Sequence, residues 1–571
     1  MARPSPVGTR HPRRLNARLV MVGIALTLAW VGVGYRLVVV QGTRAEEYAA
    51  RGLDQRLRHE TLAADRGTIF DADGRELALT VDSVTVYANP KEITRPDVVA
   101  RLLAPLVNQE PEAVAELLSL DGTFVYIARQ LERADADLVR AADLPGIYFL
   151  EEPKRTYPAG ALTAQLIGFV RSDDNTGLEG LEYFYEEELA GTPGELLVER
   201  DPSGKTIPQG EYSVTPAEPG SDLVLTLQTS VQYAAEQALR EGMERTGASA
   251  GSVVVLDPAT GAVLAMVNLP NFDPSDRTEL TADQVRNRAV TDLFEPGSTQ
   301  KLVTVAAALE SGLVGPYTEL DIPESIEILD TVFQDFTDHP DRLSVTGIVA
   351  YSSNLGTILL GEMLGAQRLH DFMVGFGEGR RSGIDLPGEA AGVLRPAAEW
   401  CVTTCVAGTS IGYHVSVTAL QMATAYATIA NDGVWVQPHL VAEVVDGQGV
   451  RTVIESGSQR VVSVTTARQM RLMLEAVVEQ GTGSLASVEG YRVGGKTGTT
   501  KKYLSESGEY SEEDVVASFI GMAPIGDPRV VVAVVLDAPR DDASGGSGAA
   551  PVFAAVTLAV LHQLGVPPDA P

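Results

Sequence analysis

Residues 294–303 read Phe294-Glu295-Pro296-Gly297-Ser298-Thr299-Gln300-Lys301-Leu302-Val303. Pro-Gly followed by a continuous run of helix-forming residues predicts a helix N-terminus at this point. The i to i+3 spacing then places Ser298 and Lys301 on one face of the first turn. A neutral lysine amine could take the proton of the serine hydroxyl if burial or a second cation lowers the lysine pKa. An isolated Ser-x-x-Lys is more often an ordinary pair on a solvated helix, so other motifs must decide.

Two further short motifs follow in the chain. Ser352-Ser353-Asn354 offers a hydroxyl and an amide that could relay a proton and hold a peptide, although a Ser/Asn helix cap is the more common explanation of such a motif on its own. Lys496-Thr497-Gly498-Thr499 lies in a glycine-rich predicted strand whose donors suit a carboxylate. Ser-x-x-Lys, Ser-x-Asn and Lys-Thr-Gly in this order form a pattern that is far more specific than any one of them.

Lysine usage supports this interpretation. Only seven of the 44 basic residues are lysines, and the other 37 are arginines. A chain that prefers arginine so strongly has reason to keep lysine where an amine must lose its proton, which a guanidinium cannot do. Lys301 and Lys496 are the two lysines in apolar surroundings.

Composition excludes several classes of protein. The chain has 571 residues, 44% of them hydrophobic, and is too long and too apolar to be a disordered tail. A net charge of −32 repels phosphate backbones and disfavours a nucleic-acid partner. Cys401 and Cys405 are the only cysteines, which disfavours a metal site. If they lie on one helix their Cα atoms are about 6 Å apart, within disulfide range, but free thiols are an equal alternative.

The N-terminus has the pattern of a membrane anchor. Residues 1–18 hold five arginines and no acid, and the 17 residues from Leu19 to Tyr35 are uncharged. We expect a cytoplasmic tail at 1–18, a transmembrane helix at 19–40, and the rest of the chain outside the cytoplasm. A cleaved secretory signal is the alternative, but no Ala-x-Ala sequence closes the apolar run.

The remainder predicts an α+β protein in two parts. Residues 41–215 mix short strands with helical stretches such as Val98 to Leu120, and a Pro/Gly/Ser-rich stretch from Asp201 to Gly220 reads as a linker or long loop. Residues 216–571 should hold a sheet joined to a largely helical region. We predict its hairpin at Ser252 to Val267, further strands at Val515 to Met522 and Arg529 to Leu536, and a last helix, Pro551 to Leu564, packed on the sheet.

With these motifs the chain resembles the class B penicillin-binding proteins, most closely the septal, cell-division type of peptidoglycan D,D-transpeptidase. Outside the trio, three segments look like the structural motifs of that family's N-terminal pedestal: Arg66-Gly67-Thr68-Ile69-Phe70-Asp71 with Gly74, Arg155-x-Tyr157-Pro158-x-Gly160 with Gly168, and Gly177-Leu178-Glu179-Gly180-Leu181-Glu182. We interpret them as hairpin turns and arginine–carboxylate ties without chemistry. The chain departs from the family pattern at Ala72, Gln165, His414 and Ala419, and His414, in place of a usual glycine, could alter a loop near the pocket.

The resemblance implies an elongated pedestal (dimerisation-type) domain at 41–215 and a transpeptidase domain at 216–571, an antiparallel sheet flanked by helices with an all-helical subregion. It implies that Ser298 attacks the penultimate D-Ala carbonyl of a stem peptide and Lys301 takes its proton. Ser352 would carry a proton to the leaving amine near Lys496, and Asn354 would hold the donor peptide. The strand residues that would bind the substrate are Lys496, Thr497, Gly498 and Thr499. The backbone N–H groups of Ser298 and Thr499 would form the oxyanion hole.

The implied partners are peptidoglycan stem peptides on lipid II-derived glycan strands, β-lactams, a membrane glycosyltransferase and divisome proteins, with no nucleic acid. No metal or diffusible cofactor is required. A β-lactamase or D,D-carboxypeptidase would use the same trio, but no obvious Glu-x-x-Asn lies between Asn354 and Lys496 to drive deacylation. A non-catalytic division scaffold is a further alternative, which the intact trio disfavours.

Overall fold

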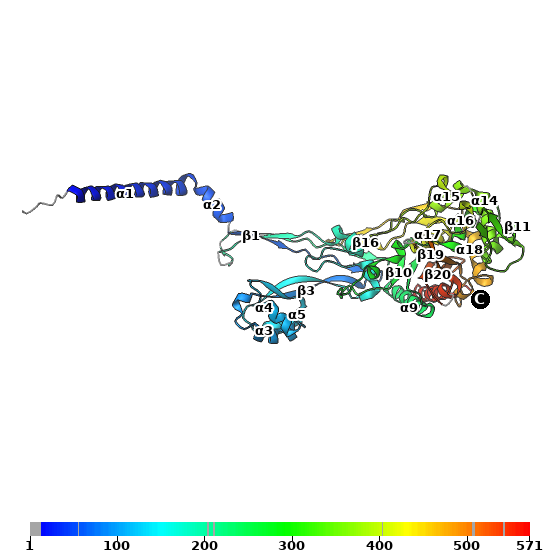
Figure 1. Cartoon of the computed structure of the whole chain (residues 1–571), viewed down its shortest axis with the longest axis horizontal. Helices are drawn as coiled ribbons and strands as arrows, with labels where there is room; N and C mark the ends of the chain where they lie inside the picture. The colour runs from blue at the N-terminus through cyan, green and yellow to red at the C-terminus, as the bar shows by residue number, and fades with distance from the viewer. Residues whose placement is uncertain are drawn as a thin grey trace, which may run out of the picture. The chain divides into compact units, whose positions relative to one another are not determined.

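A computed structural model describes residues 13–54, 56–201, 205–208, 210, 212–329, 331–401, 403–504, 509–540 and 543–570. Most of the predicted cytoplasmic tail, residues 1–12, lies outside the described residues. The chain forms two compact units, one made of Met1–Ala64 with Thr192–Glu218 and the other of Asp65–Gly191 with Pro219–Pro571. Figure 1 labels their elements along the chain.

The first unit carries the apolar N-terminal helix. Helix α1 (Arg13–Val38) is followed by a π turn (Val39–Thr43) and α2 (Ala45–Asp54). A three-stranded sheet, in the order β1 (Leu57–Leu62), β6 (Gly194–Glu199), β7 (Tyr212–Thr215), completes the unit. Residues 17–38 are all exposed, and the helical stretch Ala17–Thr43 is long and apolar enough to cross a bilayer. Because an apolar helix left uncovered by protein fits the hydrocarbon core of a membrane, we assign α1 as a membrane anchor.

A seven-stranded sheet opens the second unit. Its order is β17-β16-β8-β2-β3-β4, with β5 paired to β3. All pairs are antiparallel except that of β2 with β8. The strands come from both sides of residue 215, so this sheet includes residues from both predicted domains, 41–215 and 216–571. One segment of the first unit ends near the predicted boundary, at Glu218, and the boundary residues stay a prediction. The strand bounds are Ile69–Phe70 (β2), Glu76–Ala88 (β3), Val125–Glu132 (β4), Ile147–Thr156 (β5), Asp222–Leu225 (β8), Val441–Val445 (β16) and Arg451–Val453 (β17).

Two local predictions hold only in part. The helical run Val98 to Leu120 is broken into α3 (Pro96–Leu103), a 3₁₀ turn (Ala104–Leu106) and α4 (Pro111–Leu118). Pro105 cannot donate a backbone hydrogen bond, and Pro111 begins the next helix, as proline favours. The predicted linker Asp201 to Gly220 includes the strand β7, which pairs with β6. Its Tyr-Ser-Val-Thr sequence is rich in aromatic and β-branched residues, and this local strand preference outweighs the surrounding prolines.

The pedestal motifs form a buried ion cluster, as the sequence indicated. Arg66 Nε donates to Glu182 Oε2 at 2.6 Å, and Arg155 Nε donates to Glu182 Oε1 at 2.7 Å. Glu182 is fully buried. Each carboxylate oxygen therefore has a cationic donor, which offsets the cost of burying the charge.

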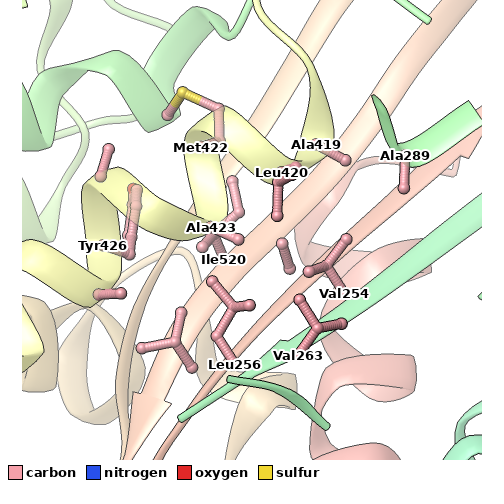
Figure 2. Close-up of a cluster of buried hydrophobic side chains, with 14 of the residues drawn as sticks. Val254, Leu256, Val263, Ala289, Ala419, Leu420, Met422, Ala423, Tyr426 and Ile520 are labelled. Carbon is pink, nitrogen blue, oxygen red and sulfur yellow. The ribbon is translucent and has the colours of Figure 1, made fainter. Parts of the chain in front are cut away.

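A five-stranded antiparallel sheet organises the C-terminal part of the chain, in the order β10-β9-β21-β20-β19. Alternate side chains of its strands enter two different cores. On one face α9 (Thr229–Thr246) and α19 (Ala550–Gln563) cover the sheet. On the other face lies α17 (Ala419–Ala430), whose Leu420, Ala423 and Tyr426 point toward Val254 and Ile520 in Figure 2. The strands are Val263–Leu269 (β10), Ala250–Leu256 (β9), Val530–Asp537 (β21), Glu509–Ala523 (β20) and Gly494–Leu504 (β19).

These elements confirm the predicted hairpin, the later strands and the last helix. The stretch Gly545–Gln563 also meets the length and apolarity of a membrane span, but 56% of it is buried, as a core helix on a sheet requires.

The helical region consists of α12 (Lys301–Glu310), α13 (Val345–Ala350), α14 (Asn354–Leu364), α15 (Ala366–Gly375), α16 (Cys405–Ser410) and α18 (Val464–Gln480).

Shorter elements connect these parts. The remaining helices and helical turns are α5 (Arg133–Ala141), α6 (Ala164–Ile167), α7 (Gly180–Phe184), α8 (Glu186–Leu189), α10 (Ala282–Val285), α11 (Arg288–Thr291), and the turns Pro90–Glu92, Gly160–Thr163, Gly297–Gln300, Ala397–Glu399, Ser484–Ala486 and Gly545–Ala549. The remaining strands are β11 (Glu319–Asp321), β12 (Ile326–Ile328), β13 (Thr331–Phe333), β14 (Arg342–Ser344), β15 (Val434–Val436) and β18 (Ser458–Arg460).

Candidate active site

The turn before α12 holds Ser298 against the edge strand β19. Gly297 has φ +52°, and a Cβ there would lie 2.3 Å from Thr500 Cγ2, so the position requires glycine. Thr500 Oγ1 donates to Glu295 O at 3.0 Å and fastens the turn to β19. Ser298 is half-buried, whereas Lys301, at the start of α12, is fully buried.

Lys301 is held by the Ser352–Asn354 segment. Its Nζ donates to Asn354 Oδ1 at 2.7 Å, to Ser352 Oγ at 3.2 Å and to Ser352 O. Burial and then repulsion by Lys496 lower the pKa of Lys301 well below its usual value, and the Asp335 carboxylate opposes this shift only in part. Three donated bonds describe the protonated amine, and the lowered pKa makes loss of one proton easier. Once the amine is neutral, the Ser352 hydroxyl can donate to it, as a general base requires.

Ser352 connects the two lysines to the nucleophile. Its hydroxyl donates to Ser298 Oγ at 3.1 Å and accepts from Lys496 Nζ at 2.9 Å as well as from Lys301. With one hydrogen bond donated and two accepted, the hydrogen-bonding capacity of this hydroxyl is fully used. Among the described residues no hydrogen bond joins Ser298 Oγ directly to Lys301 Nζ, so the connection between them runs through Ser352.

Strand β19 forms the other wall. Lys496 is fully buried, and burial lowers its pKa to about 7. Thr497 Oγ1 shares a hydrogen bond of 2.8 Å with Thr482 Oγ1, and exposed Thr499 accepts from Gly545 N at 3.0 Å. A Cβ on Gly498 would lie 3.0 Å from Thr299 Cγ2 and 2.4 Å from Ser518 Oγ, so glycine lets the strand approach the nucleophile turn closely. The eight predicted site residues thus lie on three neighbouring segments.

The alternative interpretation of Ser352-Ser353-Asn354 as a helix cap is correct for its middle residue. Ser353 is the N-cap of α14, and its Oγ accepts from Gly356 N at 2.9 Å. Ser352 adopts a left-handed φ of +59°, which turns the chain just before the cap. Capping and chemistry are therefore divided between adjacent residues.

Sequence reasoning missed a carboxylate behind this segment. Asp335 accepts hydrogen bonds from Ser353 Oγ at 2.7 Å, from Leu355 N at 3.1 Å and from Asn354 N. His339 Nε2 lies 2.7 Å from the same carboxylate. Burial acts to lower the pKa of His339, but its hydrogen bonds to Pro340 O and Asp335 outweigh burial and raise it. No motif in the sequence marks Asp335, since its partners lie about 20 residues away.

The structure also tests the expectations for the two cysteines and for His414. Cys401 and Cys405 form a disulfide with Cα atoms 5.2 Å apart, although only Cys405 lies in a helix, α16. His414 has φ +64°, the left-handed conformation that a glycine would adopt without strain, so the loop keeps this backbone conformation without glycine.

Comparison with known proteins agrees with this geometry. Residues 251–558 match the model of the penicillin-binding protein transpeptidase domain, and residues 61–225 match that of the penicillin-binding protein dimerisation domain. The chain belongs to the class B penicillin-binding proteins. The resemblance seen in the sequence is thereby confirmed.

Relatives of this penicillin-binding protein match over almost their whole length. The chain is 34% identical to penicillin-binding protein PbpB of Mycolicibacterium smegmatis, covering 95% of this chain and 90% of that protein. It is 32% identical to the peptidoglycan D,D-transpeptidase FtsI of Escherichia coli, covering 98% and 94%. The structure of penicillin-binding protein 3 from Mycobacterium tuberculosis complexed with aztreonam superposes with a TM-score of 0.71 at 32% identity, covering 90% of this chain and 99% of that one.

Asp335 offers a test of how this penicillin-binding protein orders its active site. Asp335→Asn should slow acylation by a fluorescent penicillin roughly 10-fold or more, since one lost charge-assisted cap releases the Ser352–Asn354 segment. Asp338→Asn, at an exposed position three residues away, is the matched control and should acylate normally. Equal acylation rates for the two variants would show that the cap does not order the site.

Proposed function

We propose that this penicillin-binding protein crosslinks peptidoglycan stem peptides as a serine D,D-transpeptidase. The observation that carries the proposal is the network in which Ser352 bridges Ser298 to two buried lysines. Two buried amines beside each other, both with lowered pKa, suit proton transfer and have a high cost in a merely structural core.

In the first half-reaction Ser298 Oγ attacks the penultimate D-Ala carbonyl. Its proton passes through the Ser352 hydroxyl to Lys301, the C–Oγ bond forms, and the C–N bond to the terminal D-Ala breaks. Ser352 returns a proton to the leaving amine. Backbone N–H groups of Ser298 and Thr499 stabilise the oxyanion, and a single such donor typically contributes about 3 kcal/mol.

The substrate is held by the two flanking segments. Asn354 Nδ2 and Oδ1 can bond the donor peptide backbone, while Lys496, Thr497 and Thr499 along the edge of β19 bind the terminal carboxylate. Gly498 lets β19 lie close to the turn that carries Ser298, because a Cβ there would lie 3.0 Å from Thr299 Cγ2. In the second half-reaction an acceptor amine attacks the ester, the peptide bond forms, and Ser298 regains its proton.

A product analysis tests this proposal. The full-length protein in detergent, given glycan strands with pentapeptide stems, should produce crosslinked dimers that disappear when a β-lactam is added. A β-lactamase or D,D-carboxypeptidase would instead turn over the β-lactam or release D-Ala without dimers. Cleaved monomers as the only product would therefore contradict transpeptidation.

We further propose a septal role with the N-terminus in the cytoplasm and the catalytic part outside. The N-terminal arginines favour that orientation, and the chain is similar to the peptidoglycan D,D-transpeptidase FtsI of Escherichia coli and to stage V sporulation protein D of Bacillus subtilis. A membrane glycosyltransferase and divisome proteins are the expected partners. Green fluorescent protein fluoresces only when it folds in the cytoplasm. Fused to the N-terminus of this protein, it should give fluorescence at division sites. A dark but expressed fusion would contradict the orientation, and lateral-wall fluorescence would contradict septal use.

A further inference from the structure

A cavity of about 1040 Å³ lies beside the nucleophile turn, and Glu295 is part of its wall. Glu295 precedes Ser298 by three residues, and its carbonyl is bonded by Thr500, which also lines the cavity. None of the residues assigned above to the proton network lines it. The cavity therefore adjoins the site of acyl transfer without being the site itself.

The Glu295 carboxylate has neutral donors. Tyr510 OH donates to Oε1 at 3.0 Å or Oε2 at 2.9 Å, and His414 N donates to Oε1 at 2.9 Å. Burial raises the pKa of Glu295, because these donors do not fully replace the lost water. In the described part of the chain no arginine or lysine forms an ion pair with it.

Other acids of the same wall differ from Glu295. Asp292 is paired with Arg288 at 2.8 Å, and Asp537 is paired with Lys502 at 2.7 Å. Glu399 is exposed, so water solvates its charge. Glu295 is thus the half-buried carboxylate of this wall that lacks a cation, and an incoming cation would offset its desolvation.

The second substrate of the proposed reaction supplies such a cation. An aliphatic amine is protonated at neutral pH, and a cavity of this volume can hold a peptide segment. Lys501 and Arg395 line the same cavity, are exposed, and form no ion pair within the described residues, so they can meet carboxylates of that peptide.

We propose that Glu295 binds the protonated amino group of the acceptor stem peptide, and that the cavity beside it is the acceptor subsite. This inference rests on the proposed function. The bound ammonium loses one proton to solvent before it reacts. The amine then forms the C–N bond, the ester C–Oγ bond breaks, and the second amine proton returns to Ser298 Oγ through Ser352. Glu295 acts in this step as a binding and positioning group.

Partitioning of the acyl-enzyme tests the inference. The full-length protein is acylated with a D-Ala thioester donor, and the ratio of aminolysis to hydrolysis is measured with D-alaninamide, which is charged, and with hydroxylamine, which is uncharged. This ratio does not depend on how fast the acyl-enzyme forms. In Glu295→Gln the D-alaninamide ratio should fall about 10-fold, the cost of one charged hydrogen bond, while the hydroxylamine ratio keeps its value.

Two further variants separate the effect of the Glu295 charge from an effect on the shape of the turn before α12. Glu399→Gln removes an exposed carboxylate of the same wall and should change neither ratio. Tyr510→Phe removes a support of Glu295 but keeps its charge, so the preference for the charged acceptor should persist. If Glu295 only shaped the turn, Tyr510→Phe and Glu295→Gln would lower both ratios alike.

The outcomes are distinct. An unchanged D-alaninamide ratio in Glu295→Gln, or an equal fall for hydroxylamine, overturns the inference. A folded Glu295→Gln protein that forms no acyl-enzyme also overturns it, because Glu295 would then be needed to hold the turn that carries Ser298. If the wild-type protein itself forms no acyl-enzyme, the proposed function fails first, which is a different result from failed acceptor selection.

Discussion

Ser298→Ala should abolish covalent labelling by β-lactams and crosslinking alike. Alanine provides no oxygen to form the ester, and loss of a nucleophile costs on the order of 10⁶-fold in a comparable serine enzyme. Intact-protein mass spectrometry after penicillin treatment measures the outcome directly, because an acyl adduct adds the mass of the whole drug.

A serine at the far end of the adjoining helix provides the control for this experiment. Ser311 is the C-cap of α12, whereas Ser298 lies in the turn before that helix begins, and Ser311→Ala should be labelled like the wild type. Labelling of Ser298→Ala at the level of Ser311→Ala would place the acylated residue elsewhere and remove the basis of the mechanism. A Ser298→Ala protein that still supports division in cells would favour the scaffold alternative instead.

The parts of the site that could be predicted from sequence are those specified by local spacing. Ser298 and Lys301 are one helical turn apart, and the three glycines of residues 494–498 mark a strand that another backbone approaches closely. The hairpin around Asp257–Gly261 and the apolar strand near Val530 carry their own turn and β-branched signals. Each of these predictions needed only residues that are neighbours in the chain.

What could not be predicted depends on contacts between distant segments. Asp335 caps α14 across about 20 residues, and Tyr510 reaches Glu295 across 215. Ser352, and not Lys301, contacts the Ser298 hydroxyl across 54 residues, and Ser352 has a left-handed backbone that the sequence does not predict at a non-glycine residue. The resemblance to a known family supplied the roles, but the connecting geometry required the folded chain.

Acylation should fall steeply as the pH is lowered, because the reaction needs Lys301 without its proton. Burial and the neighbouring Lys496 lower the pKa of Lys301, so the amine is neutral above that pKa and is protonated below it. The rate constant for penicillin acylation, measured from about pH 5 to 9, should therefore rise with pH on its acid limb. A flat profile would count against lysine as the base.

Lys496 should shape the other limb of the same profile. With a pKa lowered to about 7, its cationic form, which attracts the substrate carboxylate, is lost as the pH rises above neutrality. The two amines both contact Ser352. The two apparent pKa values of the bell-shaped pH–rate profile therefore belong to the pair of lysines and not to either residue alone.

Lys301→Arg provides the sharpest version of this test. A guanidinium keeps its proton across the whole range, so the variant should lose about 10²–10⁴-fold in acylation rate and lose the acid limb with it. Lys91→Arg, at an exposed lysine of a 3₁₀ turn, is the matched control and should retain the wild-type profile. If Lys301→Arg kept the acid limb, the titrating group would have to be another one, and the neutral amine beside Ser352 would not be the base.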